Sequence, residues 1–196
     1  MKSRFAVAAC AALLLTGCIN NLALDNLKDT RPLGSAFNKA LFRDYSKVAR
    51  SFGEVGASAG VAFDGKASLE LTQMDSAIGA LANAYAEKAI IAARGSVVEP
   101  EPGIDIPTHK MRDRLIRALE RGKDNFPADS AHAQVAYDCW MMNATVPALT
   151  TSSKRCQTSL EVALGKLETE AKVPPPAPPA PPPPTNSDKP AVPVQP

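Results

Sequence analysis

Apolar residues recur every three or four positions along most of the chain, in five segments between residues 35 and 173. Spacing of this kind is typical of helices with one buried face. The stripe of the first segment is formed by Phe37, Leu41, Tyr45, Val48, Phe52 and Val55. No run of alternating β-branched residues occurs. The pattern therefore predicts an all-α fold of about five helices, paired as antiparallel hairpins in a helical-repeat-like bundle.

The ends of the first three helices can be placed from capping residues. Ser35 is suited to begin the first helix, and the glycines that follow the stripe predict either a frayed end or a close helix contact before a turn near Gly65. The second helix is expected from Ala67 to Ala93, with Gly95 as its C-terminal cap. An acidic connector broken by prolines follows at 96–107. The third helix begins near Thr108 and ends near Gly122.

The fourth and fifth helices each carry one cysteine on the apolar stripe. Cys139 follows Ala131 and Val135 at steps of four, and Cys156 precedes Leu160 at the same step. A turn is predicted between the helices over 143–153. Antiparallel packing would bring the two stripes together, so we expect a Cys139–Cys156 disulfide. The alternative is a metal site in which His132 and His109 join the cysteines. Because no compact ligand motif is present, no metal and no other cofactor is expected.

The first 17 residues have the organisation of an export signal. Lys2 and Arg4 precede an apolar run from Phe5 to Leu15, which is too short to span a membrane. The run ends in Leu-Thr-Gly-Cys, which resembles the bacterial lipobox and predicts lipidation of Cys18. The alternative is an ordinary secretory signal. The residue after the cysteine is Ile19 rather than aspartate, which favours the outer membrane, with the protein facing the periplasm.

The distribution of prolines indicates which part of the chain can fold as a domain. Residues 174–196 hold 12 of the 18 prolines, and a chain of this composition adopts extended polyproline II rather than packing. We interpret this tail as disordered, acting as a spacer or as a ligand for another protein. With the signal at 1–17 and a lipidated linker at 18–34, the helical domain is 35–173, the size of one ordinary domain.

Charge excludes one class of partner and suggests another. The net charge of +2 comes from Lys2 and Arg4, which leave with the signal, so the exported chain is neutral and no nucleic-acid partner is expected. The third helix nevertheless carries a basic stripe, which consists of Lys110, Arg114, Arg117 and Arg121. It is a candidate contact for an anionic surface or acidic partner. The alternative is a solvated face balanced by the neighbouring acidic connector.

Three stretches of sequence carry more specific information about the protein's family than apolar periodicity does. They are Ala40–Tyr45, then Ala84–Ala89 with the Ala-Ala-Arg-Gly that follows, and Ala133–Trp140 with Cys156. Together they resemble the helical N-terminal region of OmpA-family outer-membrane lipoproteins of alphaproteobacteria, in which the matching cysteines look like a pair. That family continues into a peptidoglycan-binding domain. Here the proline tail stands in its place, so no peptidoglycan-binding residue is carried over.

These observations lead to three functional hypotheses. The first is a non-enzymatic structural or scaffold component of the cell envelope, held to the membrane by its lipid. The second is an adaptor whose helical domain binds an envelope protein while the tail reaches peptidoglycan or another complex. The third is a hydrolase with His109 or His132 as general base. Two histidines and few aromatic residues offer little material for a catalytic pocket, so an enzyme is not expected.

Overall fold

The structure, a computed structural model, describes residues 22–61 and 69–170. Its elements are α1 (Leu22–Asn26), α2 (Ala36–Val61), α3 (Leu69–Ala93), α4 (Ile106–Gly122), α5 (Pro127–Ala144), the 3₁₀ turn η2 (Pro147–Leu149) and α6 (Thr150–Glu170). These ranges contain no strand, and no helix in them is long and apolar enough to cross a bilayer. The predicted all-α fold with five long helices is confirmed, and α1 is an additional short helix.

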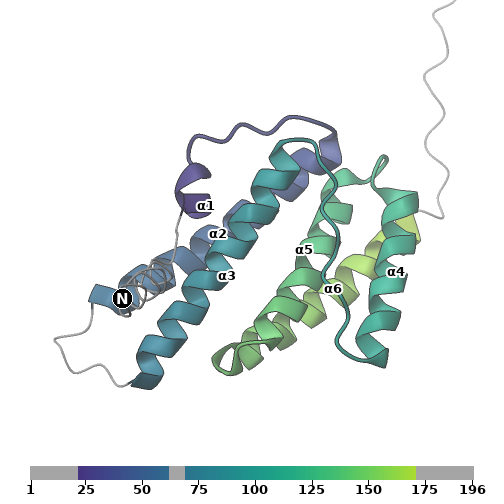
Figure 1. Ribbon diagram of the computed structural model, residues 1–196. Coiled ribbons are helices and arrows are strands. Elements are labelled where there is room, and N and C mark those ends of the chain that lie inside the picture. The colour runs from purple at the N-terminus through teal and green to yellow at the C-terminus, as the bar shows by residue number, and fades with distance from the viewer. Residues whose placement is uncertain (1–21, 62–68, 171–196) are drawn as a thin grey trace, which may run out of the picture.

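The helices are arranged as two antiparallel hairpins (Figure 1). α2 pairs with α3, α5 pairs with α6, and α5 also lies against α2. α4 packs on the outer side of the second hairpin, against α5 and α6. Two apolar cores result, and α5 contributes to both: Val135 joins the core of α2 and α3, while Tyr137 and Met141 join the core of α4 and α6. The sequence predicted one buried stripe on α5. Its central position in the bundle buries it on both sides instead.

The short helix α1 lies inside the segment predicted to be a linker, 18–34. Leu27, which follows α1, is only 1% exposed and belongs to the core of the first hairpin. Leu24 packs against Gly53 of α2, where a Cβ atom would lie 2.7 Å from the Leu24 Cδ2 atom. The close contact proposed for the glycine-rich stretch is therefore present at Gly53. α2 continues through that stretch to Val61, and the turn predicted near Gly65 lies outside the described residues.

Two glycines with left-handed backbones join the ends of α2 and α3. Gly95 has φ +77° and ends α3 as predicted, with its amide donating to the Ala92 carbonyl and the Ser96 amide donating to the Ile91 carbonyl. Gly34 has φ +84° and lies back to back with it, since a Cβ atom on Gly34 would be 2.8 Å from the Gly95 Cα atom. Side chains at this crossing would separate the two segments.

Two predicted boundaries move by a few residues. Asp105 caps α4, and its carboxylate and the Thr108 hydroxyl bond reciprocally to backbone amides in a capping box. Pro107, expected in the connector, lies in the first turn of α4, where its missing amide is not needed. The connector is therefore 96–105. The turn between the cysteine helices is also shorter than predicted, because α5 continues to Ala144 and α6 begins at Thr150.

Candidate functional site

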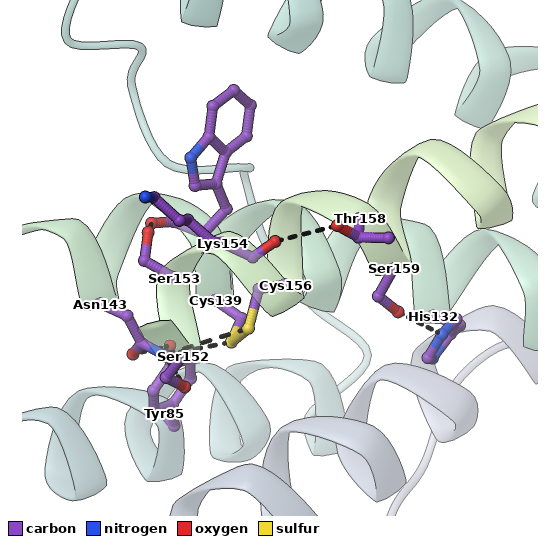
Figure 2. Close-up of a disulfide and its surroundings, with 11 residues drawn as sticks. Tyr85, His132, Cys139, Asn143, Ser152, Ser153, Lys154, Cys156, Thr158 and Ser159 are labelled. Atoms are coloured by element: carbon purple, nitrogen blue, oxygen red, sulfur yellow. Dashed lines mark hydrogen bonds between the residues drawn. A yellow bond between two sulfur atoms is a disulfide. The ribbon is translucent and has the colours of Figure 1, made fainter. Parts of the chain in front are cut away.

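Cys139 of α5 and Cys156 of α6 form a disulfide within the second hairpin (Figure 2). Their Cα atoms are 5.7 Å apart, and the predicted pairing is confirmed. Both thiols that the alternative metal site required are therefore bound to each other. In the part of the chain that the structure describes, no group of three histidine, cysteine, aspartate or glutamate side chains is placed to hold a metal ion.

Asn143 connects the disulfide to the first hairpin. Its side-chain nitrogen lies 3.3 Å from the Cys139 sulfur and donates to the Ser152 hydroxyl at 3.0 Å. Its side-chain oxygen accepts from the buried Tyr85 hydroxyl of α3 at 3.2 Å. Figure 2 shows Tyr85, Asn143 and Ser152 converging beside the sulfurs. One amide thus links α3, α5 and the start of α6.

A larger polar cluster surrounds Asp138, the residue that precedes Cys139 on α5. The Asp138 side chain is completely buried. One of its oxygens accepts from the Tyr45 hydroxyl at 2.6 Å and lies 2.9 Å from the Lys88 Nζ atom. The other oxygen accepts from the Glu101 backbone amide at 2.8 Å. A single carboxylate therefore joins α2, α3, α5 and the connector.

Lys88 of α3 supplies the positive charge of this cluster. Its side chain is 15% exposed, and its Nζ atom lies 2.9 Å from the Glu101 carboxylate and donates to the Glu99 carbonyl at 2.9 Å. The ammonium group also lies 5.9 Å from the centre of the Tyr45 ring. With Asp138, these contacts use all three donors of the ammonium group. We call Tyr45, Lys88, Glu101 and Asp138, together with Gln134 of α5, the buried polar cluster.

Burial and pairing act in opposite directions on these groups. Burial raises the pKa of Asp138, while Lys88, the Tyr45 hydroxyl and the Glu101 amide partly counteract it. Burial alone would lower the pKa of Lys88, but the carboxylates of Asp138 and Glu101 outweigh it and raise that pKa. Burial and the nearby Asp138 raise the pKa of Tyr45 well above its ordinary value. At neutral pH Lys88 is therefore a cation and Tyr45 a neutral donor.

The same cluster holds the connector 96–105 across the bundle (Figure 1). Gln134 donates to the Val98 carbonyl at 2.6 Å. Arg112 of α4 donates to the Pro100 carbonyl at 3.2 Å and to the Glu101 carbonyl at 3.0 Å. Side chains of α4 and α5 thus satisfy carbonyl groups that no helix or strand would satisfy. The connector is an ordered segment of the core.

Each of the three stretches singled out in the sequence contributes to the buried polar cluster. Ala40–Tyr45 supplies Tyr45, Ala84–Ala89 supplies Lys88, and Ala133–Trp140 supplies Gln134 and Asp138. Apolar periodicity places Tyr45 on a buried stripe but does not identify the roles of Lys88, Glu101, Gln134 and Asp138. The signal available in the sequence was a charged residue, Lys88 or Asp138, on a helix face that is otherwise apolar.

The predicted basic stripe does not form a continuous basic surface. We call it the α4-helix stripe, and it consists of Lys110, Arg114, Arg117 and Arg121. Arg114 turns toward α6 and binds both carboxylate oxygens of Glu168 at 2.7 Å. The other three residues, Lys110, Arg117 and Arg121, are exposed, and so are the acidic side chains of Asp113 and Glu120 on the same helix. Charges of both signs therefore alternate on the exposed side of α4.

A serine and a histidine meet in a groove beside the disulfide. The groove has a volume of about 280 Å³ between α2 and the second hairpin, and in it the His132 Nε2 atom lies 3.2 Å from the Ser159 hydroxyl (Figure 2). Asp44 lines the same groove, but its carboxylate binds Arg43 at 2.8 Å. His109 is exposed on α4. The histidine–serine pair thus has no carboxylate among the described residues to orient it.

One sequence match to a hydrolase motif lies in α2. Residues 56–60 read Gly-Ala-Ser-Ala-Gly, the pattern of a nucleophile elbow, which requires a sharp turn between a strand and a helix. Here all five residues belong to the continuous helix α2. The backbone that would present the serine as a nucleophile is therefore not formed at this position.

Comparison with family models, curated proteins and solved structures gave no match to this chain. Cys18, the predicted lipidation site, and the proline-rich tail lie outside the described residues.

Proposed function

We propose that this protein is a non-enzymatic, lipid-anchored scaffold component of the bacterial outer membrane, facing the periplasm. The observation that carries the proposal is how the described residues use their buried charges. Lys88 of α3 and Asp138 of α5 are bound to each other and to neighbours from α2 and the connector. A catalytic site keeps such groups available for a substrate, whereas here they hold helices together.

The sequence features of the N-terminus supply the location. A lipobox-like Leu-Thr-Gly-Cys follows a signal-type apolar run, and burial of acyl chains attached to Cys18 would anchor the protein firmly. The resemblance of three stretches to OmpA-family outer-membrane lipoproteins supports the same assignment. A disulfide between Cys139 and Cys156 suits an oxidising compartment.

The proposal can be tested by complementation of a strain that lacks the protein. We expect Cys18→Ser to abolish both acylation, measured by intact mass, and rescue of the envelope phenotype. We expect His132→Ala and Ser159→Ala to rescue fully, because neither residue performs chemistry. Full rescue by Cys18→Ser, or loss of rescue by the well-folded His132→Ala variant, would contradict the proposal.

An adaptor role is distinguished by crosslinking in intact envelopes. A scaffold should give the same crosslinked neighbours with and without residues 174–196. Loss of one defined protein, or of peptidoglycan, on removal of the tail would favour the adaptor instead. Crosslinkers placed at the exposed Arg50 of α2 and Lys154 of α6 sample two elements of the fold in each experiment.

A further inference from the structure

A basic groove follows the outer side of α2. Four cations recur along this helix at steps of four, four and three, and all four side chains are exposed: Lys39, Arg43, Lys47 and Arg50. They surround a groove of about 580 Å³, and Pro32 and the half-buried Phe42 add apolar surface to it. Its volume is in the range of small-molecule sites. We call it the α2 groove.

Among the side chains that the structure describes, only one of the four cations of the α2 groove has an anionic partner. Arg43 binds Asp44 at 2.8 Å. In the described ranges 22–61 and 69–170, Lys39, Lys47 and Arg50 take part in no ion pair. The α4-helix stripe differs, because exposed acidic residues alternate with its cations. A cluster of cations around a concave surface concentrates positive potential and attracts anions.

A second observation points to a ligand at the same place. Ser46 lines the groove and is only 6% exposed, and its hydroxyl has no hydrogen-bond partner in the described structure. A buried hydroxyl without a partner is costly to the folded state. The hydroxyl oxygen is shielded from solvent, so a rotation of the Ser46 side chain toward the groove would let a phosphate oxygen accept from it while the surrounding cations neutralise the phosphate charge.

We infer that the α2 groove binds the phosphate headgroup of an anionic phospholipid. Cationic side chains fit the phosphate, and Phe42 and Pro32 fit the apolar portion next to it. Position agrees with this ligand if Cys18 is acylated, because the chain from residue 18 to the start of α1 at Leu22 spans at most ~14 Å. This last point rests on the proposed function, whereas the charge, the volume and the Ser46 hydroxyl do not.

The test uses the full chain and a soluble lipid, so it does not depend on the anchor. Lysine acetylation is measured by mass spectrometry with dihexanoyl-phosphatidylglycerol, with dihexanoyl-phosphatidylcholine and with inorganic phosphate. We expect the anionic lipid alone to protect Lys39 and Lys47 about fivefold, while Lys110 and Lys154 label at unchanged rates. Acylation of Cys18 is read separately from the intact mass, so failure of the anchor and failure of the groove are distinguishable.

Matched variants distinguish binding at the α2 groove from nonspecific attraction of the lipid to the positive charge of the protein. Lys39→Gln with Arg50→Gln should weaken phosphatidylglycerol binding about tenfold or more. Arg117→Gln with Arg121→Gln on α4 removes the same charge and should leave binding unchanged. Ser46→Ala should weaken binding about fivefold without lowering the melting temperature of the free protein, because the deleted hydroxyl has no partner to lose.

Several results would overturn the inference. Equal protection by phosphatidylcholine, or equal protection of all four lysines, would show that no specific anionic site exists. Protection by inorganic phosphate alone to the same degree would assign the groove to a free anion. Protection by a hexaglutamate peptide but not by phosphatidylglycerol would assign it to an acidic protein. Equal loss of binding in the Arg117→Gln, Arg121→Gln variant would show that lipid binding depends on the net charge of the protein and not on the α2 groove.

Discussion

The ammonium group of Lys88 lies 2.9 Å from the fully buried carboxylate of Asp138. This pair joins α3 of the first hairpin to α5 of the second. Removing one member of such a pair leaves an uncompensated charge in an apolar environment, which costs far more than the pair itself contributes. Substitution of one member of the pair alone is therefore expected to destabilise the fold strongly.

We expect Lys88→Met to lower the free energy of unfolding by about 3 kcal/mol or more, because Asp138 is then left without a cation. Asp138→Asn should cost less, because Lys88 keeps the Glu101 carboxylate at 2.9 Å. The double variant should lose less than the sum of the two, because neither charge is then left alone. Urea unfolding followed by circular dichroism measures all three. The exposed pair Lys166 and Asp129, 2.7 Å apart, provides the control: Lys166→Met should cost less than about 1 kcal/mol. Strict additivity of the buried substitutions would contradict this account.

High pH should unfold the protein in one step with ionisation of its tyrosines. All three tyrosines, Tyr45, Tyr85 and Tyr137, are fully buried. Burial raises the pKa of Tyr137 from 10.0 to about 12 and raises those of Tyr45 and Tyr85 as well. The pKa of Lys88 is also raised, through its carboxylate partners.

The direction in which stability changes with pH follows from the number of protons that each state binds. Above pH 10 the unfolded chain releases protons that the native state retains, so stability present at neutral pH falls as pH rises. Ultraviolet absorbance of ionised tyrosine should therefore increase together with the loss of helical circular dichroism. Tyrosine ionisation that is complete near pH 10, while the helices remain intact, would show that these side chains are accessible in the native state.

Loss of the disulfide should destabilise the second hairpin without changing the fold. The bond joins residues separated by 17 positions, and closing a loop of that length is worth ~3 kcal/mol on the chain-entropy model. We expect Cys139→Ala with Cys156→Ala, or reduction of the wild type, to lower the free energy of unfolding by that order. Reduction of the double variant serves as the control and should change nothing. Alkylation of Cys139 and Cys156 in non-reduced protein would contradict the pairing.

The crossing of Gly34 and Gly95 should not tolerate a methyl group. A Cβ atom at Gly34 would meet the Gly95 backbone at 2.8 Å, and its φ of +84° is unfavourable for alanine. Gly34→Ala is therefore expected to cost more than about 1 kcal/mol in thermal unfolding. Gly165→Ala on α6, where nothing lies within 4 Å, should instead stabilise by about 0.5–1 kcal/mol. Similar effects at both positions would contradict the close packing.

Features that depend on local spacing could be predicted from the amino-acid sequence. Apolar periodicity predicted the five long helices, because a helix places every third or fourth residue on one face. Gly95 identified the end of α3, since glycine adopts the left-handed cap without strain. The disulfide was predicted from two cysteines on facing stripes joined by a short turn. Each inference needed only residues that are close in the chain, or one simple antiparallel pairing.

The partners of the buried polar side chains could not be predicted in this way, because they depend on how the helices pack. Lys88 and Asp138 belong to different hairpins, so their contact depends on how α2 and α5 pack, and helical periodicity contains no information about that packing. The same placement of α5 buries both of its sides and holds the connector through Gln134. On α4, Arg114 leaves the predicted stripe because α6 brings Glu168 within hydrogen-bonding distance. Helix formation follows from neighbours along the chain, whereas burial and charge pairing follow from neighbours in space.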